Sequence, residues 1–477
     1  MLTALLCHTI GPTQALEEPV TVGNKHPYTL DTRIENCRVS RDLAAFQRLA
    51  HSCLPHLLGL AGHFLEKPHP EPHHLDQHRP DQLTHGEAVC RDTLLLAWRN
   101  LPDDNLYAEE TPSQWLYRIF GSVLYNRLLA IHGGESALLT WLESRQAAPI
   151  AMMDSPTGPR PACFSAIQLA QLARHTTATP PSQQLQQALE RLIQAEIDQR
   201  SAPLTPTGER VHPLLYDPEL RGRMLRSRAA FRFKEGFKRC LGRPLEDWLF
   251  RRWLNNQPGS AALERQGLPR RSVEAYLDEQ LDIEIDPARL SRGVSYPASF
   301  PVRSQRRKIS NFFLWPGDWD LPTTPLAEAE RQRFINDIWQ HRLDLSASAS
   351  YAELMKKLDQ SQPMRLHHQG ILLNTPERIL GYLYHYQLYR EDMSCFGFKN
   401  ELGKDRLGVV IDRNGVPIKT NKGLHRLAMA QTLGVQRISV RVRAIHQLWW
   451  QRHKRNATGK DALSKIVNAL GQVVYHR

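Results

Sequence analysis

The chain has 477 residues, of which 41% are hydrophobic and 23% are charged, and its formal net charge is +12 at pH 7. This length predicts roughly two to four domains, and the composition argues against wholesale disorder. The positive charge favours a polyanionic partner such as nucleic acid. The seven cysteines form no Cys-x-x-Cys pair, which argues against a disulfide framework and against a zinc ribbon.

The apolar stretch 1–10 is short and has no Lys or Arg in front of it, so it lacks the charged region of a secretory signal. No later window approaches the roughly eighteen uninterrupted apolar residues that a membrane span needs. We therefore expect a soluble, cytoplasmic protein without a membrane partner.

A segment over 67–85 is rich in proline and histidine. Imidazole is a common transition-metal ligand, so a metal site is one reading of this segment. Its prolines interrupt any helical register, however, and no cysteine or fixed ligand spacing accompanies the histidines. We therefore predict a surface loop and no metal site, with metal binding as the alternative. The histidines are His69, His73, His74, His78 and His85.

On either side of this loop the apolar residues have helical spacing, which predicts a helical bundle over 38–145. The run 87–99 followed by Trp115-Leu116-Tyr117-Arg118-Ile119 resembles region 2 of extracytoplasmic-function sigma factors of bacteria. The resemblance implies RNA polymerase as a partner and a role in transcription. A helical bundle without a polymerase partner is the alternative.

A basic helical unit is predicted over 165–285. Its positive charge is concentrated between Arg221 and Arg252, where Phe and Trp side chains are interleaved with Arg and Lys. Such a run suits contacts to DNA phosphates with some stacking, or else a solvated basic face. The candidate phosphate contacts are Arg223, Arg226 and Arg228.

Within the same unit, Gly267 lies between two short helical patterns, and the second pattern opens with Pro269-Arg270-Arg271-Ser272. This arrangement is typical of a helix-turn-helix motif. The segment 245–279 resembles region 4 of the same sigma factors. The resemblance implies that Arg270, Arg271 and Ser272 lie on a helix that contacts DNA.

The first three hundred residues are expected to be largely helical, and strand signals are confined to the end of the chain. A β-branched run over 408–412 precedes a tight turn at Gly415, a helix is predicted to begin after Gly423 and end at Gly434, and 437–442 alternates as a strand. The expected fold is therefore multi-domain, mainly α in the N-terminal and middle parts and α/β over 305–455.

The Gly423-Leu424-His425-Arg426 turn resembles ParB/sulfiredoxin-like domains, and a Gly-Asp-Trp-Asp-Leu element at 317–321 resembles uncharacterised proteins that carry such a domain. The resemblance implies that Gly423, His425 and Arg426, with Asp412 nearby, bind a phosphate or a nucleotide. Sulfiredoxins have a cysteine where Leu424 stands, so sulfinic acid reduction is not implied. Independently, unpaired N–H groups and the helix dipole favour an anion at such a helix start. The alternative is a structural turn in which Arg426 pairs with a carboxylate such as Asp412.

These patterns favour a DNA-binding, transcription-related protein with a C-terminal phosphate- or nucleotide-binding domain. The alternative is a nucleotide-dependent enzyme of phosphoryl transfer or hydrolysis, with Mg²⁺ and a nucleotide as cofactors. Such an enzyme needs a carboxylate, and the nearby candidates are Asp412, Asp405 and Glu401. A purely structural, partner-binding protein is a third reading, and the residues leave open whether the chain is an enzyme.

Overall fold

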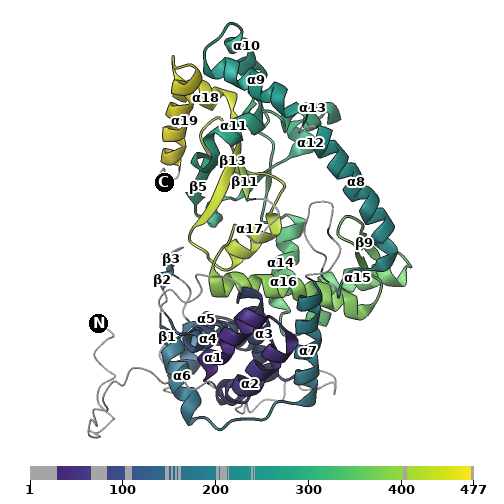
Figure 1. The fold of residues 1–477 in the computed structure, drawn as a ribbon. Helices are drawn as coiled ribbons and strands as arrows, with labels where there is room; N and C mark the ends of the chain where they lie inside the picture. Colours follow the sequence, from purple (N-terminus) through teal and green to yellow (C-terminus); the bar gives the residue numbers. More distant parts are fainter. Residues whose placement is uncertain are drawn as a thin grey trace, which may run out of the picture.

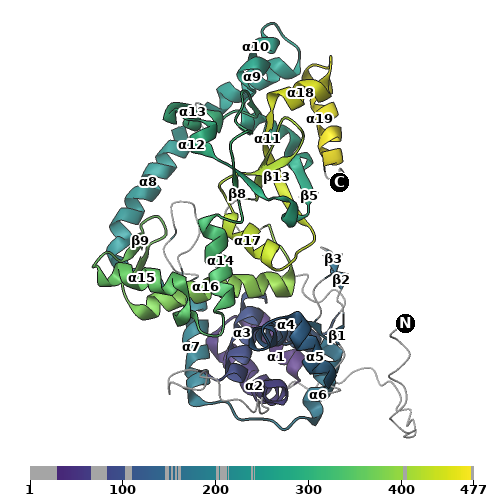
Figure 2. The same ribbon diagram turned by 180° about the vertical axis from the view of Figure 1, so that it is seen from behind.

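The structure is a computed structural model that describes residues 29–65, 83–101, 110–144, 163–199, 214–237, 242–400 and 406–473, and a few positions between these ranges. The chain is mainly helical over 30–277 and has a mixed α/β sheet region in its C-terminal part. Figure 1 shows the N-terminal helices at one end, the sheet at the other, and one long helix, α8, along the edge between them. Seen from behind, α8 again lies at the edge (Figure 2).

The N-terminal helices form a bundle around one hydrophobic core, which includes Phe46, Trp98 and Trp115. Two of them begin with capping boxes, in which a threonine and a Glu or Gln three residues later satisfy each other's backbone N–H groups. Two short strand pairs, β1 (Ile150–Ala151) with β4 (Cys163–Phe164) and β2 (Asp154–Ser155) with β3 (Gly158–Pro159), lie between α5 and α6. The helices are α1 (Leu30–Ser40), α2 (Leu43–Leu65), α3 (His85–Asn100), α4 (Pro112–Ile131), α5 (Glu135–Ser144), α6 (Ala166–His175) and α7 (Gln183–Asp198).

A 3₁₀ turn, η1 (Pro218–Leu220), leads into α8 (Arg221–Phe237). Met224 is the one residue of α8 that is fully buried, so this helix joins the two ends of the molecule with most of its surface in solvent. Three shorter helices follow: α9 (Arg243–Leu254), α10 (Ser260–Gln266) and α11 (Arg270–Leu277).

The C-terminal sheet has seven strands in the order β5-β13-β11-β12-β6-β8, and β7 also pairs with β13. β11 runs parallel to β13 and antiparallel to β12, and α17 (Leu424–Thr432) connects β12 to β13. Helices α9, α11, α17, α18 (Gln447–Lys454) and α19 (Gly459–Val473) share its larger hydrophobic core. The strands are β5 (Asp282–Ile285), β6 (Arg292–Val294), β7 (Leu314–Trp315), β8 (Thr323–Pro325), β11 (Gly408–Ile411), β12 (Pro417–Lys419) and β13 (Ile438–His446).

The sheet corrects one expectation. Strand signals are not confined to the end of the chain, because β5 and β6 lie within the first three hundred residues and pair with β13 and β12. Both strands are short, and β5 depends on a partner more than a hundred residues away, whereas β6 pairs with β8 as well as with the distant β12. The alternation of Ile283 and Ile285 with acidic residues is the local signal that indicates β5.

Helix α16 (Pro376–Phe396) links the hydrophobic cores. Its Leu388 belongs to the bundle core, Met393 to the sheet core, and Leu383 to a third core. The helices of the unit expected over 165–285 pack in different cores. Helices α6 and α7 pack in the bundle, whereas α9 and α11 pack on the sheet. The remaining elements are η3 (Asp278–Leu281), η4 (Pro287–Arg289), α12 (Tyr296–Ser299), α13 (Arg303–Ile309), α14 (Glu330–Gln340), η5 (Leu345–Ala347), α15 (Ala349–Asp359), β9 (Met364–Leu366) and β10 (Ile371–Leu373).

Candidate nucleic-acid and phosphate sites

The turn before α17 has the backbone that the sequence indicates. Gly423 is the N-cap of α17 and has a φ of +74°, in the left-handed region that glycine adopts without strain. A Cβ atom at this position would also meet Leu407 Cδ2 at 2.9 Å. The turn therefore requires glycine, and the first N–H groups of α17 lack partners within the helix.

A fully buried lysine lies beneath this turn. Lys419 Nζ donates hydrogen bonds to the carbonyl oxygens of Gly408 and Thr420, at 3.1 and 3.0 Å, and to that of Lys422. Burial, together with the nearby Arg426 and Arg443 guanidiniums, lowers the pKa of Lys419 to about 7. Three carbonyl acceptors favour the ammonium form, so this side chain is partly protonated at neutral pH and adds positive charge under the turn as the pH falls.

The two side chains of the turn are placed differently. Arg426 Nη1 donates to the carbonyl oxygen of Asn400 at 3.3 Å, and its guanidinium lies 5.6 Å from the ring of Phe398. His425 packs against Tyr386 and Phe334, with ring centroids 5.0 and 5.8 Å away. Burial lowers the pKa of His425 to about 4, so its imidazole carries no positive charge at neutral pH.

Asp412 lies away from this turn, at the opposite end of β11. Because β11 and β12 are antiparallel, Asp412 and Gly423 lie at opposite ends of β11. The four residues of this strand separate them by about 13 Å. Asp412 Oδ1 accepts the N–H groups of Asn414 and Val416, and Oδ2 lies 3.7 Å from Arg292 Nη2. Asp412 therefore shapes the β11–β12 connection and is not paired with Arg426. The other carboxylate candidates, Glu401 and Asp405, lie outside the described residues.

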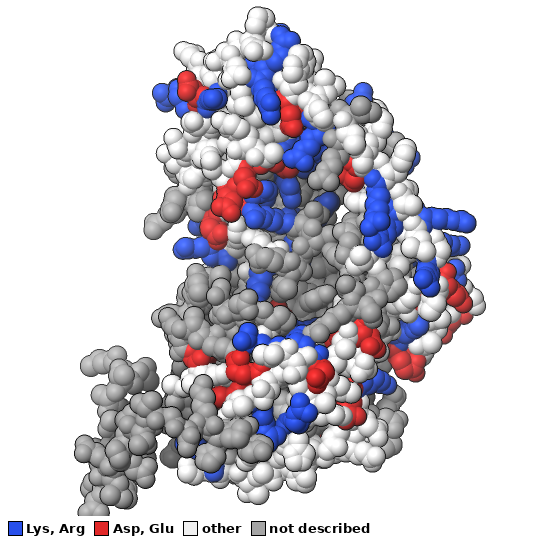
Figure 3. All heavy atoms as spheres, in the orientation of Figure 1, with Lys and Arg blue, Asp and Glu red and all other residues white. Residues whose placement is uncertain are grey.

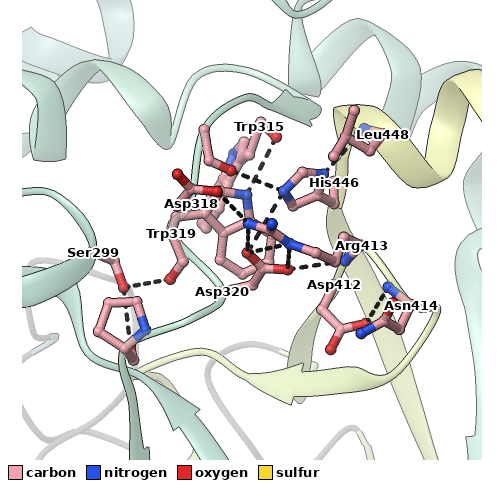
Figure 4. Close-up of polar contacts among 12 residues, drawn as sticks. Ser299, Trp315, Asp318, Trp319, Asp320, Asp412, Arg413, Asn414, His446 and Leu448 are labelled. Atoms are coloured by element: carbon pink, nitrogen blue, oxygen red, sulfur yellow. Dashed lines mark hydrogen bonds and ion pairs between the residues drawn. The ribbon is translucent and has the colours of Figure 1, made fainter.

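The 317–321 element forms a clamp on this same connection (Figure 4). Asp320, whose side chain is 2% exposed, accepts hydrogen bonds from Arg413 Nε at 2.9 Å and Nη2 at 2.6 Å. Burial opposes the ionisation of Asp320, but the bonds from Arg413 hold its pKa below the usual value. His446 Nδ1 accepts the N–H of Leu448, so Nε2 carries the proton and donates to the carbonyl oxygen of Gly317 at 2.9 Å. These polar groups are occupied by one another, and the element ties β7, which pairs with β13, to the β11–β12 connection.

The basic side chains of α8 are open to solvent. Arg223 and Arg226 are exposed and make no ion pair with any residue that the structure describes. Phe233 and Phe237, which are 80% and 60% exposed, follow them at helical spacing on the same face. Figure 3 shows basic side chains along the edge that α8 forms. The same helix carries Arg221, Arg228, Arg232 and Lys234, of which all but Arg228 are exposed.

The residues expected to contact DNA on the helix-turn-helix are engaged within the chain. The turn is present, with Gly267 at a φ of +112° between α10 and α11. Arg270 lies 3.5 Å from Glu274, Arg271 lies 3.8 Å from Glu235, and Ser272 Oγ donates to Asp247 at 2.7 Å.

The start of α11 is also covered. The N–H of Arg270 donates to the carbonyl oxygen of Asn311, and Pro269 forms a β-bridge with Phe312. Val273 and Leu277 face the sheet core. The structure thus separates an open basic helix, α8, from α11, whose arginines are partly buried and lie beside carboxylates.

The expectations about a metal site and a membrane span can be compared only with the residues that the structure describes. Among the described residues, no group of three or more His, Cys, Asp and Glu is arranged to hold a metal ion. His69, His73, His74 and His78 lie outside those residues, and His85 accepts a hydrogen bond from Arg127. No helix in the part that the structure describes has the length and hydropathy to cross a membrane.

A scan against protein-family models, a search of curated proteins and a search of solved structures each found no match for this chain.

Proposed function

We propose that this protein binds nucleic acid, and DNA in particular, through α8. The observation that carries the proposal is the exposed face on which Arg223 and Arg226 precede Phe233 and Phe237. Guanidiniums neutralise phosphates, and aromatic rings stack on unpaired bases. Trp248 is 52% exposed on α9, the next helix along the chain, and offers a further aromatic ring.

The composition of α8 supports a polyanionic partner. Arg228 and Arg232 are four residues apart, and Arg223 and Arg226 are three apart, so like charges are neighbours along the helix. Gly222 and Gly236 also weaken a helix that buries little surface. A row of phosphates relieves the repulsion and thereby stabilises α8.

An anionic membrane surface is less suitable for this helix. A helix that lies in a membrane surface segregates its apolar side chains from its basic ones. In α8 the exposed phenylalanines share a face with arginines. The mixture favours a partner that offers negative charge and flat rings together.

Fluorescence anisotropy with labelled DNA tests this proposal on the full-length chain. The Arg223→Ala, Arg226→Ala double variant is expected to bind about tenfold or more weakly, since each charge-assisted contact contributes about 1.5–3 kcal/mol. The matched control removes two charges from α19 by Lys460→Ala with Lys465→Ala. Both lysines are exposed, and α19 lies across the molecule from α8 in both views (Figures 1 and 2). Equal binding by the two double variants would contradict the assignment to α8.

We also propose that the turn before α17 binds a phosphate group, as in the nucleotide-binding alternative. The left-handed Gly423, the guanidinium of Arg426 and the buried charge of Lys419 support this. His425 and Asp412 are left out of the site, since one is neutral and aromatic-packed and the other lies at the far end of β11.

Replacing Arg426 tests the second proposal. If the wild-type chain binds ATP in equilibrium dialysis, Arg426→Ala is expected to weaken that binding by about tenfold while the melting temperature changes little. Unchanged ATP binding by Arg426→Ala would remove Arg426 from the site, and no ATP binding by the wild type would remove this nucleotide from the proposal.

A further inference from the structure

A small polar pocket lies where the N-terminal bundle meets α16. It is lined by α3, α4, α16 and the residues that follow α14, is partly open to solvent, and has room for about one water molecule. Its polar lining consists of Asp92, Asn126, Arg127, Arg342, Gln387 and Glu391. None of the phosphate or nucleic-acid contacts proposed above involves this pocket.

Gln387 is the first sign that the pocket holds a ligand. Its side chain belongs to a residue that is only 5% exposed, and it lines the pocket. Its amide makes no hydrogen bond to any residue that the structure describes. The amide is open to the pocket and otherwise unpartnered, so an occupant of the pocket that accepts its N–H group stabilises the folded chain.

The balance of charge is the second sign. Asp92 is neutralised by Arg91, whose Nη2 lies 2.7 Å from Asp92 Oδ1. Glu391 is 4% exposed and has no ion pair within 4.0 Å among the described residues. It faces three guanidiniums, those of Arg127, Arg342 and Arg390. The cluster therefore has two positive charges in excess.

Two of these arginines stack on one tryptophan ring. The guanidiniums of Arg342 and Arg390 lie 3.8 and 3.0 Å from the ring centroid of Trp339. Arg390 is 3% exposed, and its Nη1 is buried without a hydrogen-bond partner. Burial lowers the pKa of Arg127 and of Arg342 to about 10. Arg127 and Arg342 are half-buried and Arg390 is buried, so an anion that pairs with this charge stabilises the fold.

We propose that this pocket binds one small inorganic anion, of the size of chloride, between the guanidiniums of Arg127 and Arg342 and the amide of Gln387. A water molecule would satisfy Gln387 but would leave the excess charge in place. A cation is disfavoured by the same guanidiniums. Because α3, α4 and α16 all line the site, the anion links the bundle to the rest of the chain.

The pH dependence of binding follows from Glu391. Burial raises its pKa to about 7, so its negative charge is lost as the pH falls through that value. The charged groups that face it are Asp92 of α3, which Arg91 neutralises, Arg127 of α4, Arg342 after α14 and Arg390 of α16. The arginines keep their charge in this range, so anion binding is expected to tighten below pH 7.

The test is the thermal unfolding midpoint of the full chain as chloride replaces gluconate at constant ionic strength. The midpoint of the wild type is expected to rise and then saturate, because a ligand of the folded state stabilises by mass action. Gln387→Leu is expected to need about tenfold more chloride for the same rise, which corresponds to ~1.4 kcal/mol. Glu391→Gln is expected to bind chloride more tightly at pH 8, and the Lys460→Ala, Lys465→Ala variant is expected to match the wild type.

A midpoint that depends on ionic strength but not on the kind of anion would overturn the proposal, as would an unchanged chloride response in Gln387→Leu. Bromide-soaked crystals of the wild type give a readout that needs no variant. An anomalous peak between Arg342 and Gln387 is expected. A pocket that holds only water at saturating bromide would also overturn the proposal.

Discussion

Glu391 is a carboxylate whose environment makes ionisation costly. It is buried on α16 and accepts one hydrogen bond, from Asn126 Nδ2 at 2.6 Å. Burial raises its pKa from 4.5 to about 7 despite the attraction of Arg390. The folded chain therefore holds the proton more tightly than the unfolded chain, and the stabilisation that this provides is lost as the pH rises from about 4.5 through 7.

Glu391→Gln keeps an acceptor for Asn126 and removes the ionisation. We expect the variant to be more stable than the wild type at pH 8, by on the order of 3 kcal/mol, since one pKa unit corresponds to about 1.36 kcal/mol. Near pH 5 the two are expected to differ little. Urea unfolding at both pH values measures this. A variant that is less stable than the wild type at pH 8 would show that the ionised carboxylate stabilises the fold through its arginines.

At the scale of single elements, α8 combines two kinds of contact that can be separated. Phosphate contacts depend on Arg223 and Arg226, whereas stacking depends on Phe233 and Phe237, the most exposed aromatic residues of the helix. Bases in a duplex are already stacked, so exposed rings add more to the binding of single strands.

Phe233→Leu with Phe237→Leu preserves the charge and largely the apolar character of α8 while removing its rings. The double variant is expected to weaken binding to single-stranded DNA by tenfold or more, at roughly 1–3 kcal/mol per stacked base. Duplex binding is expected to change much less. Paired anisotropy titrations with the same sequence in the two forms check this, and equal losses would assign the phenylalanines a role other than stacking.

At the scale of the whole molecule, the features that depend on residues near one another in sequence are predictable from the sequence. The strand at 408–412, the glycine turn and the helix after Gly423 follow from periodicity and from the few residues that tolerate a positive φ. The basic run on α8 follows from composition, and the structure adds that it is exposed.

Features that depend on distant partners were not predictable in this way. β5 is four residues long and pairs with β13, more than 150 positions away. Asp412 and Gly423 are close in sequence, yet the antiparallel β11 and β12 place them at opposite ends of a strand. Arg270, Arg271 and Ser272 match a DNA-contacting pattern, but carboxylates from α8, α9 and α11 engage them.

The pocket beside Gln387 illustrates the same limit. Its lining comes from residues between positions 89 and 391, on three helices and one connection. A glutamine within a helix is common, and nothing in the local pattern distinguishes this one from a solvated side chain. Only the packing of α16 against the bundle shows that this residue is largely buried and that its amide has no partner among the described residues.

The central claim is that α8 binds nucleic acid through phosphate contacts, and the salt dependence of binding tests it most directly. The affinity of the full-length chain for duplex DNA is measured over a range of salt concentrations for the wild type and for the Arg223→Ala, Arg226→Ala variant. We predict a steep linear decrease of log affinity with log salt for the wild type, and a slope shallower by about 2 in the variant, since each phosphate contact contributes about 0.9. The same slope in both proteins, or wild-type binding that does not depend on salt, would contradict the account.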